Sequence, residues 1–392
     1  MSRSDVSIIA VTSSHGIMHA YLVLLPALIP LLGGELGNLA MLGLLSSLVV
    51  LFYGWGSLPV GFVADVVSKK TLMTLSMLLC GGSAILVSLS YSLPLTAVGM
   101  ILLGVGASLY HPCGYSHMAL CSPELRGRYM GIQGLGGDMG MALAYITSAV
   151  LGVALGWRNT FLVWGVVGLL MALIDWLTIV DIPVGGAGAP GKREGYLKTI
   201  KKMFATERRG TLFLVFLIII LSGALWTGVS AWILAYINSM KGVALLIAGG
   251  LSTLQYTVGA FAQILGGELS DRIGRRVILL FGFGAFTASL VALTLAPGSL
   301  PILLVLVVLL GFTFFVTQAP VNALLGDLSQ KDTVGVTYGI NFTVKYGFGF
   351  FPPAVAGFLA QNYGMDYVFY FFASLSAAAF ALTLLIREQG KA

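Results

Sequence analysis

Charged side chains are scarce in this chain. Asp, Glu, Lys and Arg make up 9% of the 392 residues and hydrophobic residues make up 58%, whereas a soluble domain carries roughly 25% charged residues. A chain this long and this apolar cannot cover its surface with polar groups, which excludes an ordinary soluble protein. The apolar runs are continuous and do not alternate in short segments, so they predict membrane-spanning helices and not a β-barrel.

The chain also has few cysteines and no recognisable catalytic motif. The three cysteines, Cys80, Cys113 and Cys121, form no CxxC pair and predict no disulfide framework. The sequence has no nucleotide-binding loop, no nucleophile–base arrangement and no soluble domain that could receive a signal. These absences argue against an enzyme, and we expect no cofactor. A membrane-embedded metal or redox enzyme or sensor is the most distant alternative.

Twelve apolar runs, most of about 20 residues or more, predict twelve transmembrane helices. The one long break separates six runs from six, so we expect an all-α membrane protein with halves at 1–182 and 210–392. The break, 183–209, opens with glycine and proline and continues with basic residues, which predicts a basic linker at the membrane surface. The predicted spans are 6–32, 40–64, 71–91, 94–120, 129–153, 158–181, 210–237, 243–267, 277–296, 300–325, 335–361 and 365–386.

The basic residues are distributed unevenly over the two sides of these spans. With a cytoplasmic N-terminus, almost all of the 21 Lys and Arg residues fall on the cytoplasmic side. Only Arg158 and Lys241 fall on the other side, and Lys345 lies within a span. The positive-inside rule therefore predicts that both termini and the linker are cytoplasmic. The net charge of +6 follows from this orientation and does not indicate nucleic-acid binding.

A ten-residue pattern occurs once in each half, beginning at Gly61 and at Gly267. Each copy contains an acid followed by a basic pair and lies between two predicted spans, which is typical of a tight turn at the membrane surface. The repeat extends further, since Pro112 corresponds to Pro320 at nearly the same offset. Parallel repeats predict two halves related by a pseudo-twofold axis along the membrane normal. The residues of the repeated turn are Gly61, Asp65, Lys69, Lys70, Gly267, Asp271, Arg272, Arg275 and Arg276.

Ionisable residues within the predicted spans are costly, and each is a candidate for function. His15 and His19 are four residues apart and share one helix face, while His111 lies deep in another span. Asp138 follows a glycine-rich run that lets helices approach closely, and Lys345 lies about ten residues into its span. We predict that Asp138, His19 and His111 are the candidates for proton coupling.

Other interpretations of these residues remain open. Each group could instead make a structural hydrogen bond between helices, which is the favoured interpretation for His117 and Asp175. Two histidines at i, i+4 with a third could also bind a metal ion. No cysteine or carboxylate spacing supports that site, so we predict no metal.

The repeated turn resembles the loop between the second and third helices of each half in major facilitator superfamily transporters. The second copy fits that pattern fully; the first lacks the arginine after Asp65. Three further stretches resemble the fosmidomycin-resistance-type branch: 14–19, 104–112 and 133–138. His19 stands where that branch usually has an acid, and Asp138 where it usually has an asparagine, which suggests that the proton site has moved.

The resemblance implies how these residues are used. In that fold the first and fourth spans of each half line a central cavity, and the repeated turns form gates. We therefore expect a secondary active transporter, a monomer in the inner membrane of a bacterial or archaeal cell, that exports a small organic anion or a drug in exchange for protons. The alternative is a proton-coupled importer or facilitator of a small organic anion. The expected substrate-binding residues are His15, His19, Tyr110, His111, Gln133, Trp226, Gln318, Asn322, Asn341 and Lys345.

Overall fold

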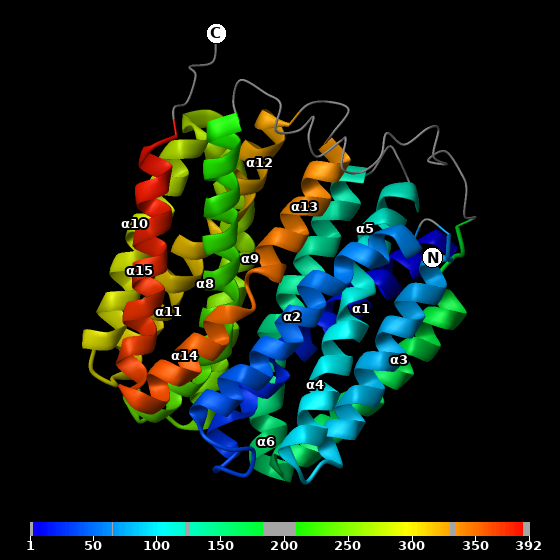
Figure 1. Ribbon diagram of the computed structural model, residues 1–392, viewed down its shortest axis with the longest axis horizontal. Helices are drawn as coiled ribbons and strands as arrows, with labels where there is room; N and C mark the ends of the chain where they lie inside the picture. The colour runs from blue at the N-terminus through cyan, green and yellow to red at the C-terminus, as the bar shows by residue number, and fades with distance from the viewer. Residues whose placement is uncertain (1–2, 65, 122–125, 183–208, 330–333, 387–392) are drawn as a thin grey trace.

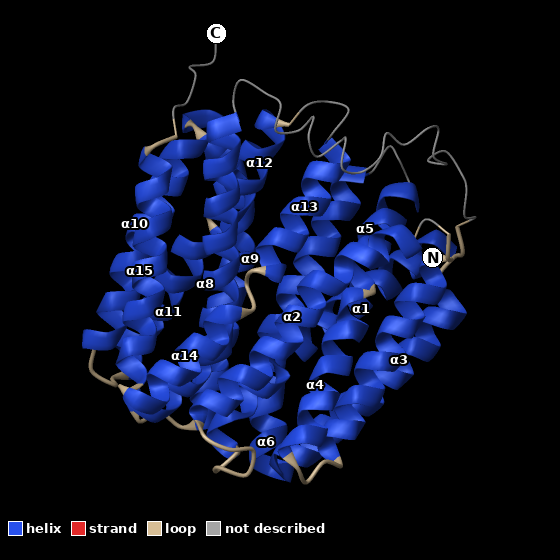
Figure 2. Cartoon of the chain, viewed as in Figure 1, coloured by secondary structure: helices blue, strands red, loops and turns tan. Residues whose placement is uncertain are grey.

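The computed structural model describes residues 3–64, 66–121, 126–182, 209–329 and 334–386. Asp65 and nearly all of the predicted linker therefore lie outside the described residues. Within these ranges the chain forms helices and no β-strand, which confirms the predicted all-α class for this part (Figure 2). The first helices are α1 (Arg3–Leu28), the short 3-10 helix η1 (Ile29–Leu31), α2 (Leu39–Val63), α3 (Lys69–Ser88), α4 (Leu93–Ser108), α5 (Tyr110–Cys121) and α6 (Arg126–Thr178). The others are α8 (Arg209–Lys241), α9 (Leu245–Ile273), α10 (Arg275–Leu295), α11 (Leu300–Phe315), α12 (Gln318–Leu328), α13 (Val334–Gly347), α14 (Phe351–Asn362) and α15 (Met365–Leu384).

The described residues contain 10 helices that are long and apolar enough to cross a membrane by length and composition. One of them, α6, is 53 residues long and covers two of the predicted spans. Gly156 inside it has a non-helical backbone, with φ 81° and ψ 162°, at the predicted junction of those spans. Glycine adopts this positive φ without the steric cost that a side chain brings. The chain therefore turns at Gly156, where the sequence predicted the junction of two spans, although α6 is assigned as one element across this residue.

The predicted span 335–361 is interrupted and appears as the two shorter helices α13 and α14. The interruption lies just before the Pro352–Pro353 pair at the start of α14. Proline lacks a backbone N–H and disfavours helical backbone in the residue before it, so a helix breaks at such a pair. Neither piece reaches the length of a full span, and the count of twelve stays a prediction.

Two groups of helices pack side by side, as Figure 1 shows. In the first, α6 runs along α1 and α3, and α4 packs between α2 and α3. In the second, α15 packs on α8 and α10, and α9 packs on α11. The groups meet along two seams, where α2 (blue) lies against α13 and α14 (orange) and where α6 lies against α9.

Small residues allow the close approach at the seam between α2 and α14. The Cα atom of Gly357 would lie 3.0 Å from a Cβ added at Gly43, and the carbonyl oxygen of Pro353 would lie closer still. Ser47 also contributes to this seam, since its Oγ accepts a hydrogen bond from the N–H of Ala354 at 2.9 Å. Backbones in membranes approach in this way at small residues.

Replacing Gly43 with alanine is expected to lower the apparent melting temperature of the detergent-purified protein. The added methyl group meets backbone atoms, which cannot rotate away, and overpacking of this kind costs about 1–3 kcal/mol. Gly82→Ala on α3 is the matched control, because nothing lies within 4 Å of its added Cβ. Thermal unfolding followed by tryptophan fluorescence compares the two variants. Equal melting temperatures for both would contradict this account of the seam.

Candidate functional site

Three buried histidines from two helices meet inside the first group of helices. The Nε2 atom of His111 on α5 lies 3.3 Å from Nε2 of His15 and 3.4 Å from Nε2 of His19, both on α1. All three side chains are at most 5% exposed. We call His15, His19 and His111 the histidine cluster.

Hydrogen bonds hold the ring of His15 in one orientation. Its Nδ1 lies 2.6 Å from the carbonyl oxygen of Gln133 on α6. A carbonyl only accepts, so Nδ1 carries the hydrogen and Nε2 presents a lone pair. The ring also stacks on Tyr110 at a centroid distance of 5.4 Å, and the Tyr110 hydroxyl accepts from the side-chain amide of Gln133 at 3.1 Å. Three of the predicted substrate-binding residues thus support one another.

Aromatic side chains from the second group of helices cover the histidine cluster. Trp226 on α8 lies edge-on to His19 at a centroid distance of 6.0 Å. Phe342 on α13 lies 4.7 Å from His111, and Tyr346 contacts Trp226 at 5.3 Å. The predicted residue Trp226 is therefore brought to the histidines, and the site is built from both groups of helices.

Four aromatic residues at this site are not among the predicted site residues: Tyr53, Tyr115, Phe342 and Tyr346. The hydroxyl of Tyr53 on α2 lies 3.2 Å from both ring nitrogens of His111, and the ring of Tyr115 lies 5.6 Å from that of His111. Tyr53 could have been identified from the sequence, because a tyrosine hydroxyl deep in an apolar span needs a polar partner. Phe342 and Tyr346 lie one residue from the predicted Asn341 and Lys345, so the right stretch was identified.

Two polar pairs link α12 and α13 next to the aromatic residues. The ammonium group of Lys345 donates to Oε1 of Gln318 at 2.9 Å, and the side-chain amide of Asn341 donates to Oδ1 of Asn322 at 3.1 Å. The pairs are one helical turn apart on each helix. All four of these predicted residues are therefore together.

Asp138 on α6 faces this arrangement from the first group of helices. Its side chain is half-buried, and it makes no hydrogen bond or ion pair to any residue that the structure describes. Its charge interacts with that of Lys345, which also interacts with His19. An acid and a base thus interact through their charges, without a hydrogen bond or ion pair between them in the described part of the chain.

His117 and Asp175, for which the sequence favoured a structural role, make interhelical hydrogen bonds. His117 lies 3.2 Å from the hydroxyl of Ser7, and Asp175 accepts from the hydroxyl of Ser14 at 2.6 Å. These contacts tie α1 to α5 and to the end of α6. They give both residues a partner away from the histidine cluster.

The described residues of the repeated turns contact their own group of helices. Arg275 binds Asp271 and lies 3.3 Å from Asp327 on α12, and Arg276 donates to the carbonyl of Leu384 at 2.9 Å. In the first copy, Lys70 lies over the ring of Trp176 at 5.1 Å. Lys69, also a predicted gate residue, makes a long hydrogen bond of 3.5 Å to the carbonyl of Ala64. The other described gate residues lie in the helices that enter the turns: Gly61 in α2, and Gly267 and Arg272 in α9.

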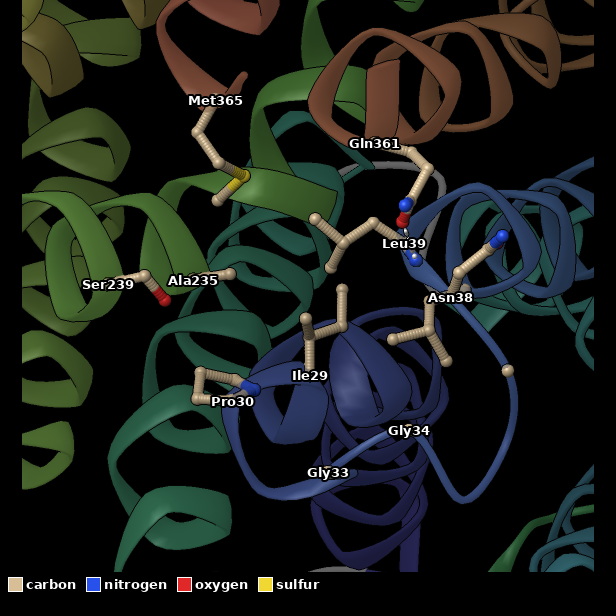
Figure 3. A pocket seen from close by; sticks show the side chains of 12 residues that line it. Ile29, Pro30, Gly33, Gly34, Asn38, Leu39, Ala235, Ser239, Gln361 and Met365 are labelled. Carbon is tan, nitrogen blue, oxygen red and sulfur yellow. Dashed lines mark hydrogen bonds between the residues drawn. The ribbon is translucent and has the colours of Figure 1, made fainter. Parts of the chain in front are cut away.

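A separate pocket of about 360 Å³ lies at the helix ends (Figure 3). Its walls come from the segment around Ile29 and Gly34, from α8 near Ser239, and from Gln361 and Met365. The N–H of Leu39 donates to Gln361 across it at 3.1 Å. None of the predicted site residues lines this pocket, so it is distinct from the histidine cluster.

Similar proteins identify the family. The family model described as Major Facilitator Superfamily matches residues 11–353 and 251–392. The chain is 25% identical to a probable sulfoacetate transporter, SauU, of Cupriavidus necator over 86% of this chain and 82% of that protein. It is 23% identical to the fosmidomycin resistance protein of Escherichia coli over 92% of this chain and 87% of that protein.

A solved structure agrees at the level of the fold. A bacterial homolog of the human lysosomal transporter Spinster, in an inward-facing and occupied conformation, superposes with a TM-score of 0.83. It is 17% identical and covers 96% of this chain and 95% of that one. The expected resemblance to the superfamily and to fosmidomycin-resistance-type proteins is confirmed, and so is the expectation that the chain is no enzyme. The chain is an integral membrane protein and a transporter, and it belongs to the major facilitator superfamily.

Proposed function

We propose that this transporter moves a small organic anion together with a proton, through a site between its two halves. The observation that carries the proposal is the charge interaction between Lys345 and Asp138, close to the histidine cluster. A positive charge inside the membrane is costly unless another group compensates it. Among the described residues Lys345 donates to one neutral group, Gln318, and its ammonium group lies 5.6 Å from the centroid of the Tyr346 ring. A full negative charge must therefore come from Asp138 or from a bound anion.

The proton and the anion help each other to bind. When Asp138 is ionised it compensates Lys345, and when it is protonated the positive charge of Lys345 is free to attract a carboxylate, sulfonate or phosphonate. Coupling between two ligands is reciprocal, so a bound anion also strengthens the binding of the proton. The other titratable groups that sense Asp138 are Tyr115, Tyr256 and Tyr346. Tyrosine is uncharged near neutral pH, so Lys345 is the charged group among them that affects the proton affinity of Asp138.

We assign the proton to Asp138 and not to His19 or His111. The Nε2 atoms of these two histidines face each other at 3.4 Å, whereas Asp138 has no bonded partner among the described residues. The substrate is then held by Lys345 and Gln318, the Asn322–Asn341 pair and the aromatic face of Trp226, with His15, Tyr110 and Gln133 supporting the wall. SauU, named for sulfoacetate, is a relative whose named substrate has this chemistry.

Export in exchange for protons is the second candidate. The relative named as a fosmidomycin resistance protein favours it, as does the resemblance of the first, fourth and fifth spans. In that case the proton on Asp138 and the substrate would exclude each other. The electrostatics of Lys345 and Asp138 favour joint binding, and for this reason we rank export second.

Transport proceeds by alternating access in this proposal. Two halves of six helices, 1–182 and 210–392, rock about the site, and the turns at Asp65 and Asp271 close the cytoplasmic face. A ligand shifts such an equilibrium only by its different affinity for the two states. The unit is a monomer in the inner membrane of a bacterial or archaeal cell, with cytoplasmic termini and linker.

Proteoliposomes that contain a pH-sensitive dye test the proposal. Sulfoacetate, fosmidomycin, a sugar and a cationic drug are added outside in turn, and the pH of the lumen is followed. Joint transport acidifies the lumen as the anion enters, while exchange makes it alkaline. Uptake of an anion with no change in lumenal pH, or a response only to the cationic drug, would overturn the proposal. Protein-free liposomes give the leak for each compound.

A further inference from the structure

Two nitrogen–nitrogen distances in the histidine cluster match those of a metal site. In a tetrahedral site with metal–nitrogen bonds of about 2.0–2.1 Å, two ligand nitrogens lie roughly 3.3–3.4 Å apart. Nε2 of His111 lies 3.3 Å from Nε2 of His15 and 3.4 Å from Nε2 of His19. One candidate ligand atom from each of the three residues falls within 4.8 Å of the other two.

The hydrogen atoms of the cluster cannot satisfy both contacts at once. His15 keeps its hydrogen on Nδ1 for the carbonyl of Gln133, so its Nε2 is an acceptor. Nε2 of neutral His111 carries at most one hydrogen, which can point to His15 or to His19 but not squarely to both. If His19 is the donor instead, two lone pairs face each other between His111 and His15. A cation at the centre removes this conflict, because it accepts a lone pair from every Nε2.

The surroundings suit a neutral three-histidine site. The contact from Nδ1 of His15 to a carbonyl is the outer hydrogen bond that typically orients a ligating histidine. Tyr53, Trp226 and Phe342 enclose the rings and limit access of water. Nδ1 of His19 is buried without a hydrogen-bond partner, so this arm lacks an outer bond and we expect weaker binding than in a fully supported site.

We propose that His15, His19 and His111 bind one divalent transition metal ion of the zinc type through their Nε2 atoms. This reverses the prediction of no metal from the sequence. That prediction rested on the lack of a spacing motif, whereas the proposal rests on distances between residues of two helices. Three protein ligands leave a fourth position for water or another oxygen ligand. The inference does not depend on the proposed transport of an anion, because metal binding is measured on the isolated protein.

Cobalt titration of protein that carries no histidine tag tests this inference. The detergent-purified protein is stripped with a chelator, and Co²⁺ is added while the visible absorption of tetrahedral cobalt is recorded. One equivalent is expected to bind and to be displaced by Zn²⁺. His15→Gln and His19→Gln are each expected to weaken binding by at least about tenfold, since even loss of an outer-shell partner costs this much.

His117→Gln is the matched control, because His117 is a fully buried histidine that contacts Ser7 and not the cluster. It is expected to keep the parental stoichiometry and spectrum. Size-exclusion profiles and melting temperatures show which variants are folded. The inference is wrong if the folded parent binds no cobalt at saturation, if cobalt spectra lack tetrahedral character, or if folded His19→Gln binds like the parent.

Discussion

Replacing Asp138 with asparagine is expected to reduce substrate-driven proton movement to the level of protein-free liposomes. Asparagine has a similar shape but cannot carry a proton, and no other described carboxylate faces Lys345 at this site. In the joint-transport mechanism the variant resembles the protonated protein. The affinity for the anion should therefore persist at high pH, where the parent loses it as Asp138 ionises. Binding isotherms at several pH values, together with lumenal pH recordings, measure both effects.

Asp175→Asn is the matched control for this experiment. It removes a buried carboxylate that already has a hydrogen-bond partner, the hydroxyl of Ser14 at 2.6 Å. We expect it to keep proton coupling, since asparagine can still accept from that hydroxyl. Coupling that survives in Asp138→Asn, or that is lost equally in both folded variants, would rule out Asp138 as the proton carrier.

Replacing Lys345 with glutamine is expected to give the second large effect, a loss of affinity for the anionic substrate. Removing one member of a buried, hydrogen-bonded charge pair costs about 2–5 kcal/mol, which is roughly thirtyfold or more in a dissociation constant. Glutamine can still bond to Gln318, so the loss reports on charge. Isothermal titration with the anion that gave the strongest lumenal response measures it.

The double variant Lys345→Gln with Asp138→Asn sharpens this test. If the two charges act on each other, the effects of the single changes will not add, as a double-mutant cycle reveals. Lys241→Gln is the control, because Lys241 ends α8 and donates to the carbonyls of Thr294 and Ala296 at 3.0 and 2.8 Å. Parental affinity in Lys345→Gln would contradict an electrostatic role, and an equal loss in Lys241→Gln would indicate a general defect in folding.

Composition and motifs were enough to predict the membrane class, the helical fold and the family. Hydropathy depends on composition along the chain, and a span of about 20 apolar residues can satisfy its backbone only as a helix. The residues worth testing were also visible, since a histidine, an acid or a lysine inside an apolar run is unusual wherever it occurs. Gly156 lies at a predicted junction of spans, where the structure has a non-helical residue, whereas the Pro352–Pro353 pair lies inside the predicted span 335–361, which the structure interrupts.

Which of these residues meet depends on how the helices pack in three dimensions. The i, i+4 spacing aligned His15 with His19, but the distance of either to His111 depends on how α1 packs against α5. Tyr53 and Phe342 entered the site because α2 and α13 lie along the same seam. Lys345 donates its hydrogen bond to Gln318 and interacts with Asp138 only through charge. Such contacts join residues far apart in the chain, and local periodicity carries no information about them, because it fixes the face of one helix and not the neighbour that this face finds.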